Sequence, residues 1–186
     1  MAIEVLSVSD KNVNNLLFSL YALVNRRRSG QRHVAHRDLK TDNILITEKK
    51  VLIADFGFSD ILPNEDTMAT QRKGTVVYMS PEQFLKRPFD PFKCDMFALG
   101  VVHWCMVFKV NVLNQDTMEP MMETVRTKLS PTSIDRLILT NLLEYQPEER
   151  LSIFELIFLM EESCFSHRIA KLKAFKIHKD DTFLPS

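Results

Sequence analysis

Glycine is scarce in this sequence. The 186 residues contain four glycines, namely Gly30, Gly57, Gly74 and Gly100. A glycine-rich loop that cradles phosphate groups needs several glycines within a few residues of one another, and no two of these four stand that close. The sequence therefore excludes a glycine-rich phosphate loop from these residues.

Cysteine is also scarce, the formal net charge is zero, and long apolar runs are absent. The three cysteines lie far apart without metal-ligand spacing, and an odd number of thiols fits a reducing compartment. Basic and acidic residues number 24 each, so charge predicts neither nucleic acid nor an acidic membrane as the main partner. No apolar run reaches the length of about 18 residues that spans a membrane, and no secretory signal pattern opens the chain. We expect an intracellular, cytoplasmic protein, with the nucleus left open.

Four polar side chains stand at fixed offsets within residues 36–57. They are Asp38, Lys40, Asn43 and Asp55. Transfer of a phosphoryl group requires such a set, because the moving group is dense in negative charge and catalysis consists mostly of positioning and cations. Asp38 can accept the proton of an attacking hydroxyl, and Lys40 can neutralise developing charge. Asn43 and Asp55 offer the oxygen ligands that Mg²⁺ prefers.

Two short apolar runs, 44–46 and 51–54, separate these polar residues. Their length and composition predict the strands of a tight hairpin across the polar residues 47–50. Such a hairpin would hold Asn43 and Asp55 near one another on a rigid base. The alternative is a solvated loop between two buried strands.

Residues 36–57 resemble the catalytic loop and the Asp-Phe-Gly motif of the eukaryotic protein kinase family. The residues that carry the resemblance are His36, Arg37, Asp38, Lys40, Asn43, Asp55, Phe56 and Gly57. The likeness extends over about residues 11–160. It implies a mainly α fold with a small β-hairpin, as in the larger C-terminal lobe of a kinase. The implied domain occupies residues 1–166, and a basic tail follows at 167–186.

The resemblance also implies roles for the polar set. Asp38 would be the catalytic base, Lys40 the cation on the phosphate side, and Asn43 and Asp55 the Mg²⁺ ligands. Leu45, with its neighbours on the first strand, would line the lower half of the adenine site. The implied cofactors are ATP and Mg²⁺, and the implied reaction transfers the γ-phosphoryl group of ATP to Ser or Thr hydroxyls of a protein substrate.

Two further sets of contacts are implied by the resemblance. His36 would be a packing residue stacked near Phe56 rather than a base. Thr75, which follows a glycine, would hydrogen-bond to Asp38 and Lys40. The combination of Lys40 with Thr75 resembles the serine/threonine branch of the family rather than the tyrosine branch.

Residues 58–79 are polar and are predicted to be irregular. They resemble the family's activation segment, which here closes on a Ser-Pro-Glu sequence with Ser80 in place of alanine. Thr67 and Thr70 are candidate phosphorylation sites, and Thr70 is preferred. A phosphate there would order the segment against Arg37. An unmodified loop threonine is an equally weighted alternative.

Apolar periodicity predicts several helices. A stripe at helical spacing predicts one at 11–27, and an almost wholly apolar run predicts a buried helix at 97–108 with Asp95 as its cap. Further helices are expected near 118–125, from Ser130 and from Pro147. In the family, the residue matching Asp95 also binds the backbone of the catalytic loop. A buried ion pair joins the residues matching Glu82 and Arg150.

A complete kinase also grips its nucleotide with a lysine and a glutamate of a smaller lobe. Neither can be identified in these 186 residues, so we expect this chain alone to bind Mg-ATP poorly. A second hypothesis is therefore a non-catalytic binding or regulatory module. Either hypothesis allows a regulatory partner that supplies or covers the face toward the smaller lobe.

Overall fold

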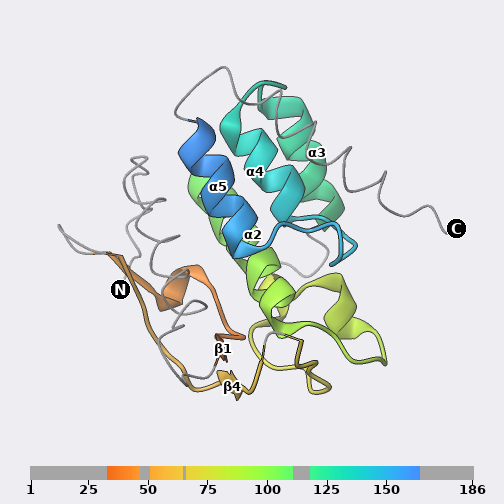
Figure 1. Ribbon diagram of the computed structural model, residues 1–186. Helices are drawn as coiled ribbons and strands as arrows, with labels where there is room; N and C mark the ends of the chain where they lie inside the picture. Colours follow the sequence, from red (N-terminus) through yellow and green to blue (C-terminus); the bar gives the residue numbers. More distant parts are fainter. Residues whose placement is uncertain (1–32, 47–50, 65, 111–117, 164–186) are drawn as a thin grey trace, which may run out of the picture.

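The structure, a computed structural model, describes residues 33–46, 51–64, 66–110 and 118–163 (Figure 1). The helix expected at 11–27 and the basic tail at 167–186 lie outside these residues. In chain order the described elements are β1 (His33–Ala35), η1 (Thr41–Asn43), β2 (Ile44–Ile46), β3 (Val51–Ile53), β4 (Asp60–Leu62), η2 (Val76–Tyr78), η3 (Pro81–Phe84), α2 (Pro91–Phe108), α3 (Met118–Lys128), α4 (Ile134–Leu142) and α5 (Ile153–Ser163). This part of the chain is mainly helical, with short antiparallel strands, as the sequence predicted.

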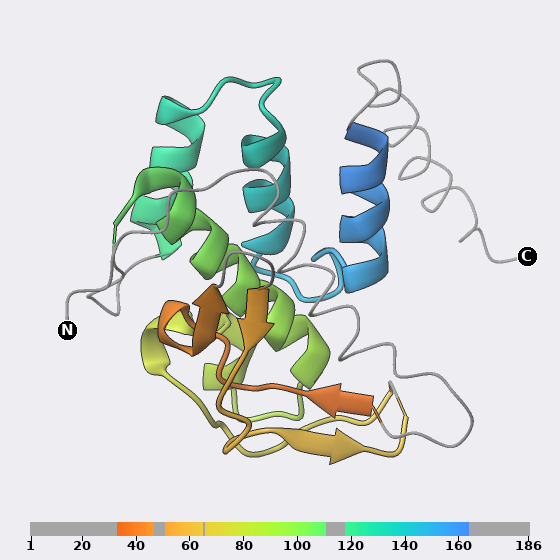
Figure 2. The same ribbon diagram turned by 90° about the vertical axis from the view of Figure 1, so that its left-hand side faces the viewer.

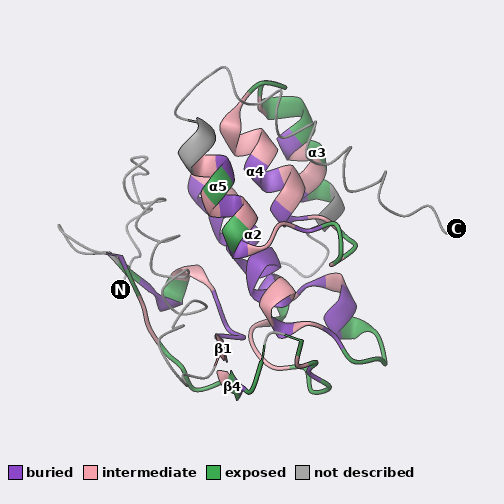
Figure 3. Cartoon of the chain, in the orientation of Figure 1, coloured by how far each residue is buried: buried purple, intermediate pink, exposed green. Residues whose placement is uncertain are grey.

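Helix α2 runs through the middle of the described part and is buried along most of its length (Figure 3). A helix that is apolar all round is expected to be buried in this way. Asp90 caps its start by accepting a hydrogen bond from the backbone N–H of Phe92 at 2.8 Å, and Pro91 occupies the first turn. The predicted start at residue 97 is therefore wrong. Asp95 lies inside the helix and does not cap it.

Helix α2 is also long and apolar enough to cross a membrane, with 18 residues of mean hydropathy 1.2. However, 72% of it is buried inside the protein. It also carries two charged residues, Lys93 and Asp95. The core helix of a soluble protein has the same properties, so α2 does not show a membrane span.

Helix α4 packs against α2, and α3 packs against α4, so that α3, α4 and α5 all lie toward one end of α2 (Figures 1 and 2). Gly100 lets α4 approach closely, because a Cβ atom there would lie only 2.8 Å from the Cβ of Leu142 and 3.0 Å from Cδ2 of Leu143. The most buried apolar side chains of this core are Val101, Val102, Val125, Leu139, Leu142, Leu143 and Leu156. The core is thus built by the helices, and the strands lie at its edge.

The starts of two helices differ from prediction. Helix α4 does not begin at Ser130, whose carbonyl instead accepts a hydrogen bond from the N–H of Ser133 in a turn, and the helix starts at Ile134. Before α5, the N–H and the hydroxyl of Ser152 both donate to Oε2 of Glu155 at 2.8 Å. In return, the N–H of Glu155 donates to Oγ of Ser152 at 3.3 Å. These bonds in both directions form a capping box, and it starts the helix later than the predicted Pro147.

The strands form two separate antiparallel pairs (Figure 2). Strands β2 and β3 make the predicted hairpin, with Ile44 opposite Ile53. Strand β4 pairs with β1, which places Asp60 opposite Ala35. The expectation that residues 58–79 are irregular throughout is therefore wrong, because 60–62 form a strand.

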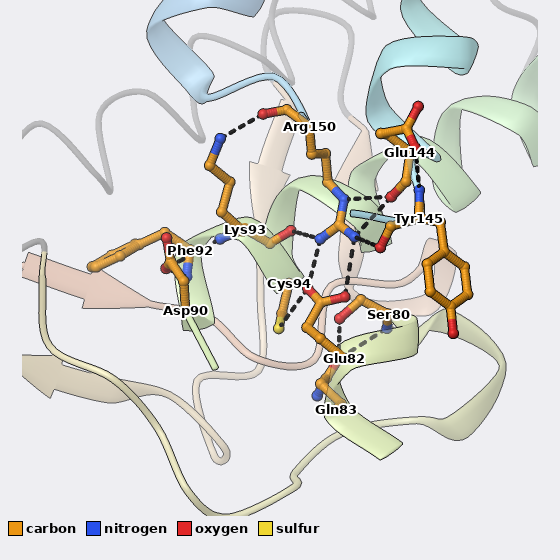
Figure 4. A network of polar contacts seen from close by, with 10 residues as sticks. All are labelled: Ser80, Glu82, Gln83, Asp90, Phe92, Lys93, Cys94, Glu144, Tyr145 and Arg150. Carbon is orange, nitrogen blue, oxygen red and sulfur yellow. Dashed lines mark hydrogen bonds and ion pairs between the residues drawn. The ribbon is translucent and has the colours of Figure 1, made fainter. Parts of the chain in front are cut away.

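Arg150 and Glu82 form a buried ion pair between η3 and the turn before α5 (Figure 4). Nη1 of Arg150 donates to Oε1 of Glu82 at 2.7 Å, and Nη2 donates to Oε2 at 3.1 Å. The backbone carbonyls of Lys93 and Glu144 accept further bonds from the guanidinium. Burial opposes ionisation of Glu82, but the bonds and charge of Arg150 outweigh it and lower the pKa of the carboxyl. The pairing expected from the sequence is present.

Replacing Arg150 by methionine should lower the free energy of unfolding by about 3–5 kcal/mol, because the carboxylate of Glu82 would remain buried without its cation. Urea denaturation measures the change. The double variant Arg150→Met/Glu82→Met should recover much of the loss. Arg87→Met, at an exposed arginine, should change stability by no more than about 0.5 kcal/mol. A loss at Arg150 no larger than the loss at Arg87 would contradict this account.

Candidate active site

Asp38 is held from two sides at the centre of the site. Its Oδ1 accepts hydrogen bonds from the backbone N–H and from the hydroxyl of Thr75, both at 2.8 Å. The ammonium of Lys40 lies 3.1 Å from Oδ2 of Asp38 and donates to Oγ1 of Thr75 at 2.9 Å. The structure thus brings together three side chains that the sequence singled out, although Thr75 lies far along the chain from the other two.

Gly74 allows this close approach of the activation segment. Its φ is +103°, and a Cβ atom at this position would lie 2.3 Å from the carbonyl oxygen of Arg37. A side chain is excluded here both by the backbone conformation and by the space. The glycine that precedes Thr75 therefore sets the distance between the segment and the catalytic loop.

Asn43 connects Asp38 to the hairpin. The side-chain nitrogen of Asn43 donates to the backbone carbonyl of Asp38 at 2.9 Å. The backbone carbonyl of Asn43 accepts the N–H of Ala54 at 2.8 Å. Ala54 directly precedes Asp55, whose φ is +61° and whose Oδ1 accepts the N–H of Gly57 at 3.2 Å. Hydrogen bonds through Asn43 therefore link the Asp38 loop to the residue before Asp55.

His36 lies buried beneath these residues and is 1% exposed. Its Nε2 lies 3.1 Å from the carbonyl of Ala54, its Nδ1 lies 3.3 Å from the N–H of Asp38, and its ring contacts Phe56 with centroids 5.0 Å apart. These partners assign the neutral form with the proton on Nε2. Burial lowers the pKa of His36, against the opposing charges of Asp38 and Asp55. The ring packs against Phe56 as the resemblance implied.

Asp95 supports the loop from helix α2. Its Oδ2 accepts the backbone N–H of His36 at 2.6 Å, and its Oδ1 accepts that of Arg37 at 2.8 Å. Burial raises the pKa of Asp95 to about 7 despite these two donors. Arg37 has a φ of +66°, an unusual conformation for a residue with a side chain. The contact implied by the family resemblance is present, and it ties the loop to the core.

Arg37 makes contacts that the sequence did not predict. Its guanidinium donates to Oδ2 of Asp60 and to the carbonyl of Gln71, and it lies 5.9 Å from the centroid of the Phe89 ring. The sequence gives no sign of Asp60 as a partner, because a strand of three residues shows too little periodicity to be predicted. Thr70, the preferred phosphorylation site, is exposed beside Gln71.

The hairpin presents an apolar face beside Asn43 and Asp55. Leu45 on β2 is 51% exposed and Leu52 on β3 is 46% exposed. Within the described ranges, no three His, Cys, Asp or Glu side chains gather as a ready-made metal site. Two oxygen ligands suit Mg²⁺, which usually keeps several waters and binds substrate phosphates. Because the nitrogen of the Asn43 amide donates to Asp38, the amide oxygen is the atom left for a metal.

Comparison with known proteins places this geometry in a family. Residues 28–159 match the family described as "Protein kinase domain". The chain is 34% identical over 131 residues to serine/threonine-protein kinase Nek4 of Mus musculus, covering 66% of this chain and 16% of that protein. It is 28% identical over 164 residues to dual specificity protein kinase shkE of Dictyostelium discoideum, covering 82% and 23%.

A third relative is activin receptor type-1B of Mus musculus, 30% identical over 174 residues that cover 81% of this chain and 33% of that protein. The chain therefore spans a third or less of the length of each of these three relatives. The family match extends over most of the chain and includes every side chain of the site described above. This chain belongs to the eukaryotic protein kinase family.

Proposed function

We propose that this chain carries the phosphoryl-transfer site of a protein serine/threonine kinase, which moves the γ-phosphoryl group of ATP to a Ser or Thr hydroxyl of a protein. The observation that carries the proposal is the arrangement around Asp38. One of its oxygens is fixed by two hydrogen bonds from Thr75, and Lys40 lies 3.1 Å from the other.

In this proposal Asp38 orients the attacking hydroxyl and accepts its proton. The bonds from Thr75 fix the carboxylate, so little reorganisation is needed when the hydroxyl arrives. Lys40 places a positive charge beside the transferring group, where negative charge develops. Its hydrogen bond to Thr75 holds the ammonium in place. The Lys40–Thr75 pair supports the serine/threonine branch. Of the relatives above, one is named a serine/threonine-protein kinase and another a dual specificity protein kinase.

We propose that the oxygen atoms of Asn43 and Asp55 hold Mg²⁺ and that Leu45 contacts the adenine of ATP. Mg²⁺, when bound, neutralises and orients the phosphates. Asn43 contributes a defined geometry, because its amide nitrogen is bound to the carbonyl of Asp38 and its backbone to Ala54. The exposed Leu45 supplies an apolar surface beside these ligands.

The nucleotide is expected to bind weakly to the 186-residue chain alone. These residues include no glycine-rich phosphate loop, and each lost charged contact costs about 2.7–4 kcal/mol by analogy with a removed oxyanion donor. A regulatory partner or a further lobe would cover the exposed apolar face at Leu45 and Leu52. This face also favours the second candidate, a non-catalytic kinase module that binds a protein partner.

A nucleotide titration of the chain tests the metal ligands. ATP should bind weakly and should bind at least about tenfold more tightly with Mg²⁺ than with excess EDTA, because Asp55 would hold a metal that neutralises the phosphates. Asp55→Asn should remove most of this difference. Asp42→Asn, an exposed carboxyl on the neighbouring turn η1, is the matched control and should keep it. Equal Mg²⁺ dependence in the Asp55 and Asp42 variants would refute the assignment.

Transfer of radiolabelled phosphate from ATP to a Ser/Thr peptide tests the base. We expect slow transfer by the wild-type chain, and Asp38→Asn should lower the rate by about 10²- to 10⁴-fold, the usual contribution of a general base. Asp42→Asn should retain the wild-type rate. Transfer that survives in the Asp38 variant would contradict its role. No transfer by the wild-type chain at saturating Mg-ATP would favour the non-catalytic module.

A further inference from the structure

Asp60 lies between two cations of the site. The pairing of β1 with β4 places Asp60 opposite Ala35, close to the start of the catalytic loop. Its Oδ2 accepts a hydrogen bond from the guanidinium of Arg37, and its Oδ1 accepts one from the ammonium of Lys73 at 2.7 Å. One carboxylate therefore bridges the catalytic loop and the activation segment, with a separate oxygen for each cation.

The surroundings favour the charged form of Asp60. The side chain of Arg37 is 3% exposed, and those of Asp60 and Lys73 are 28% and 30% exposed. Burial opposes ionisation of Asp60, but hydrogen bonds from Lys73 and Arg37 outweigh it and lower the pKa of the carboxyl. Hydrogen bonds to charged groups are stronger than those between neutral groups. The bridge is thus a partly shielded, charge-assisted contact.

The bridge is part of a continuous attachment of the activation segment. The carbonyl of Gln71 binds Arg37, the ammonium of Lys73 binds Asp60, and two residues later Thr75 binds Asp38. Without the carboxylate of Asp60, the two cations Arg37 and Lys73 would face the same space and repel each other. Lys73 would then lose its anionic partner, and Lys73 lies only two residues before Thr75, which orients Asp38.

We propose that Asp60 is a positioning residue, which holds the activation segment in place next to Asp38 without phosphorylation. Its carboxylate supplies the negative charge between Arg37 and Lys73, the part that the sequence assigned to a phosphate on the activation segment. The inference rests on the proposed function for its consequence, the orientation of Asp38 by Thr75, but its test does not require catalysis.

This proposal replaces the expected role of Thr70. Thr70 is exposed and neighbours Gln71, whose carbonyl already accepts a bond from Arg37. A phosphate on Thr70 that bound Arg37 would compete with Asp60 for the same guanidinium. We therefore expect the wild-type segment to be ordered whether or not Thr70 is modified.

Amide hydrogen exchange on the purified chain tests the proposal. The N–H of Thr75 is bonded to Asp38 and reports attachment of the segment. Asp60→Asn should speed exchange at Thr75 by about 10- to 100-fold, as expected for loss of a hydrogen bond to a charged group. Asp66→Asn, an exposed carboxyl on the same segment, should exchange as wild type does. Unchanged protection of Val102 in the core shows that the variant is folded.

A second variant tests the nature of the site. Asp60→Ala leaves an empty space between Arg37 and Lys73, so inorganic phosphate at tens of millimolar should restore protection of Thr75 towards the wild-type level, whereas chloride at equal ionic strength should not. Should the Asp60 variants fail to fold, Lys73→Gln keeps the Arg37–Asp60 pair and should speed exchange at Thr75 by a smaller factor.

Two results would overturn the proposal. One is an exchange rate at Thr75 in the Asp60→Asn chain that equals that of Asp66→Asn. The other is loss of protection in the wild-type chain after phosphatase treatment, matched by the Thr70→Ala variant, which would make a phosphate on Thr70 the required anion. Because exchange is measured without nucleotide, failure here is distinct from failure of the proposed transfer reaction.

Discussion

The hydrogen bonds from the backbone of His36 and Arg37 to the carboxylate of Asp95 are the contact on which the site depends. Asp95 belongs to helix α2, the most buried element of the described structure, so it offers a fixed anchor. The anchor stabilises the unusual backbone conformation of Arg37. The loop that follows then presents Asp38 and Asn43 in one direction. A change in this contact would displace the whole polar set and not one member of it.

The activation segment is fastened to the same framework at both of its ends. Near its start, Asp60 is bound by Arg37 and Lys73, and near its finish Glu82 is paired with the fully buried Arg150. The contacts of Asp60 and the ion pair of Glu82 differ in how far they are buried. The Glu82 pair lies in the core and acts on folding stability, whereas the Asp60 pair is partly exposed and acts on the position of a movable segment. Among the described residues, the hairpin face that we propose for the nucleotide instead exposes the apolar side chains of Leu45 and Leu52.

Local patterns in the sequence predicted the features that depend on residues close along the chain. The hairpin and the polar set around Asp38 belong to this group, because offsets of a few residues determine their geometry. The start of α2 differs from the predicted one because Asp90, followed by proline, is a stronger helix-start signal than Asp95. The role of Asp60 was not predictable in the same way, since its partner Arg37 lies far away in sequence and only the pairing of two three-residue strands brings them together.

The central claim is that Asp38, Asn43 and Asp55 face one metal-bound nucleotide. Paramagnetic broadening by Mn²⁺, used in place of Mg²⁺, tests it most directly in an NMR spectrum of the chain. In the presence of ATP, we predict selective broadening of the Asn43 side-chain amide and of the backbone amides of Asp38 and Asp55. Broadening centred on other carboxylates, with the resonances of Asn43 and Asp55 unaffected at saturating Mn-ATP, would contradict the account.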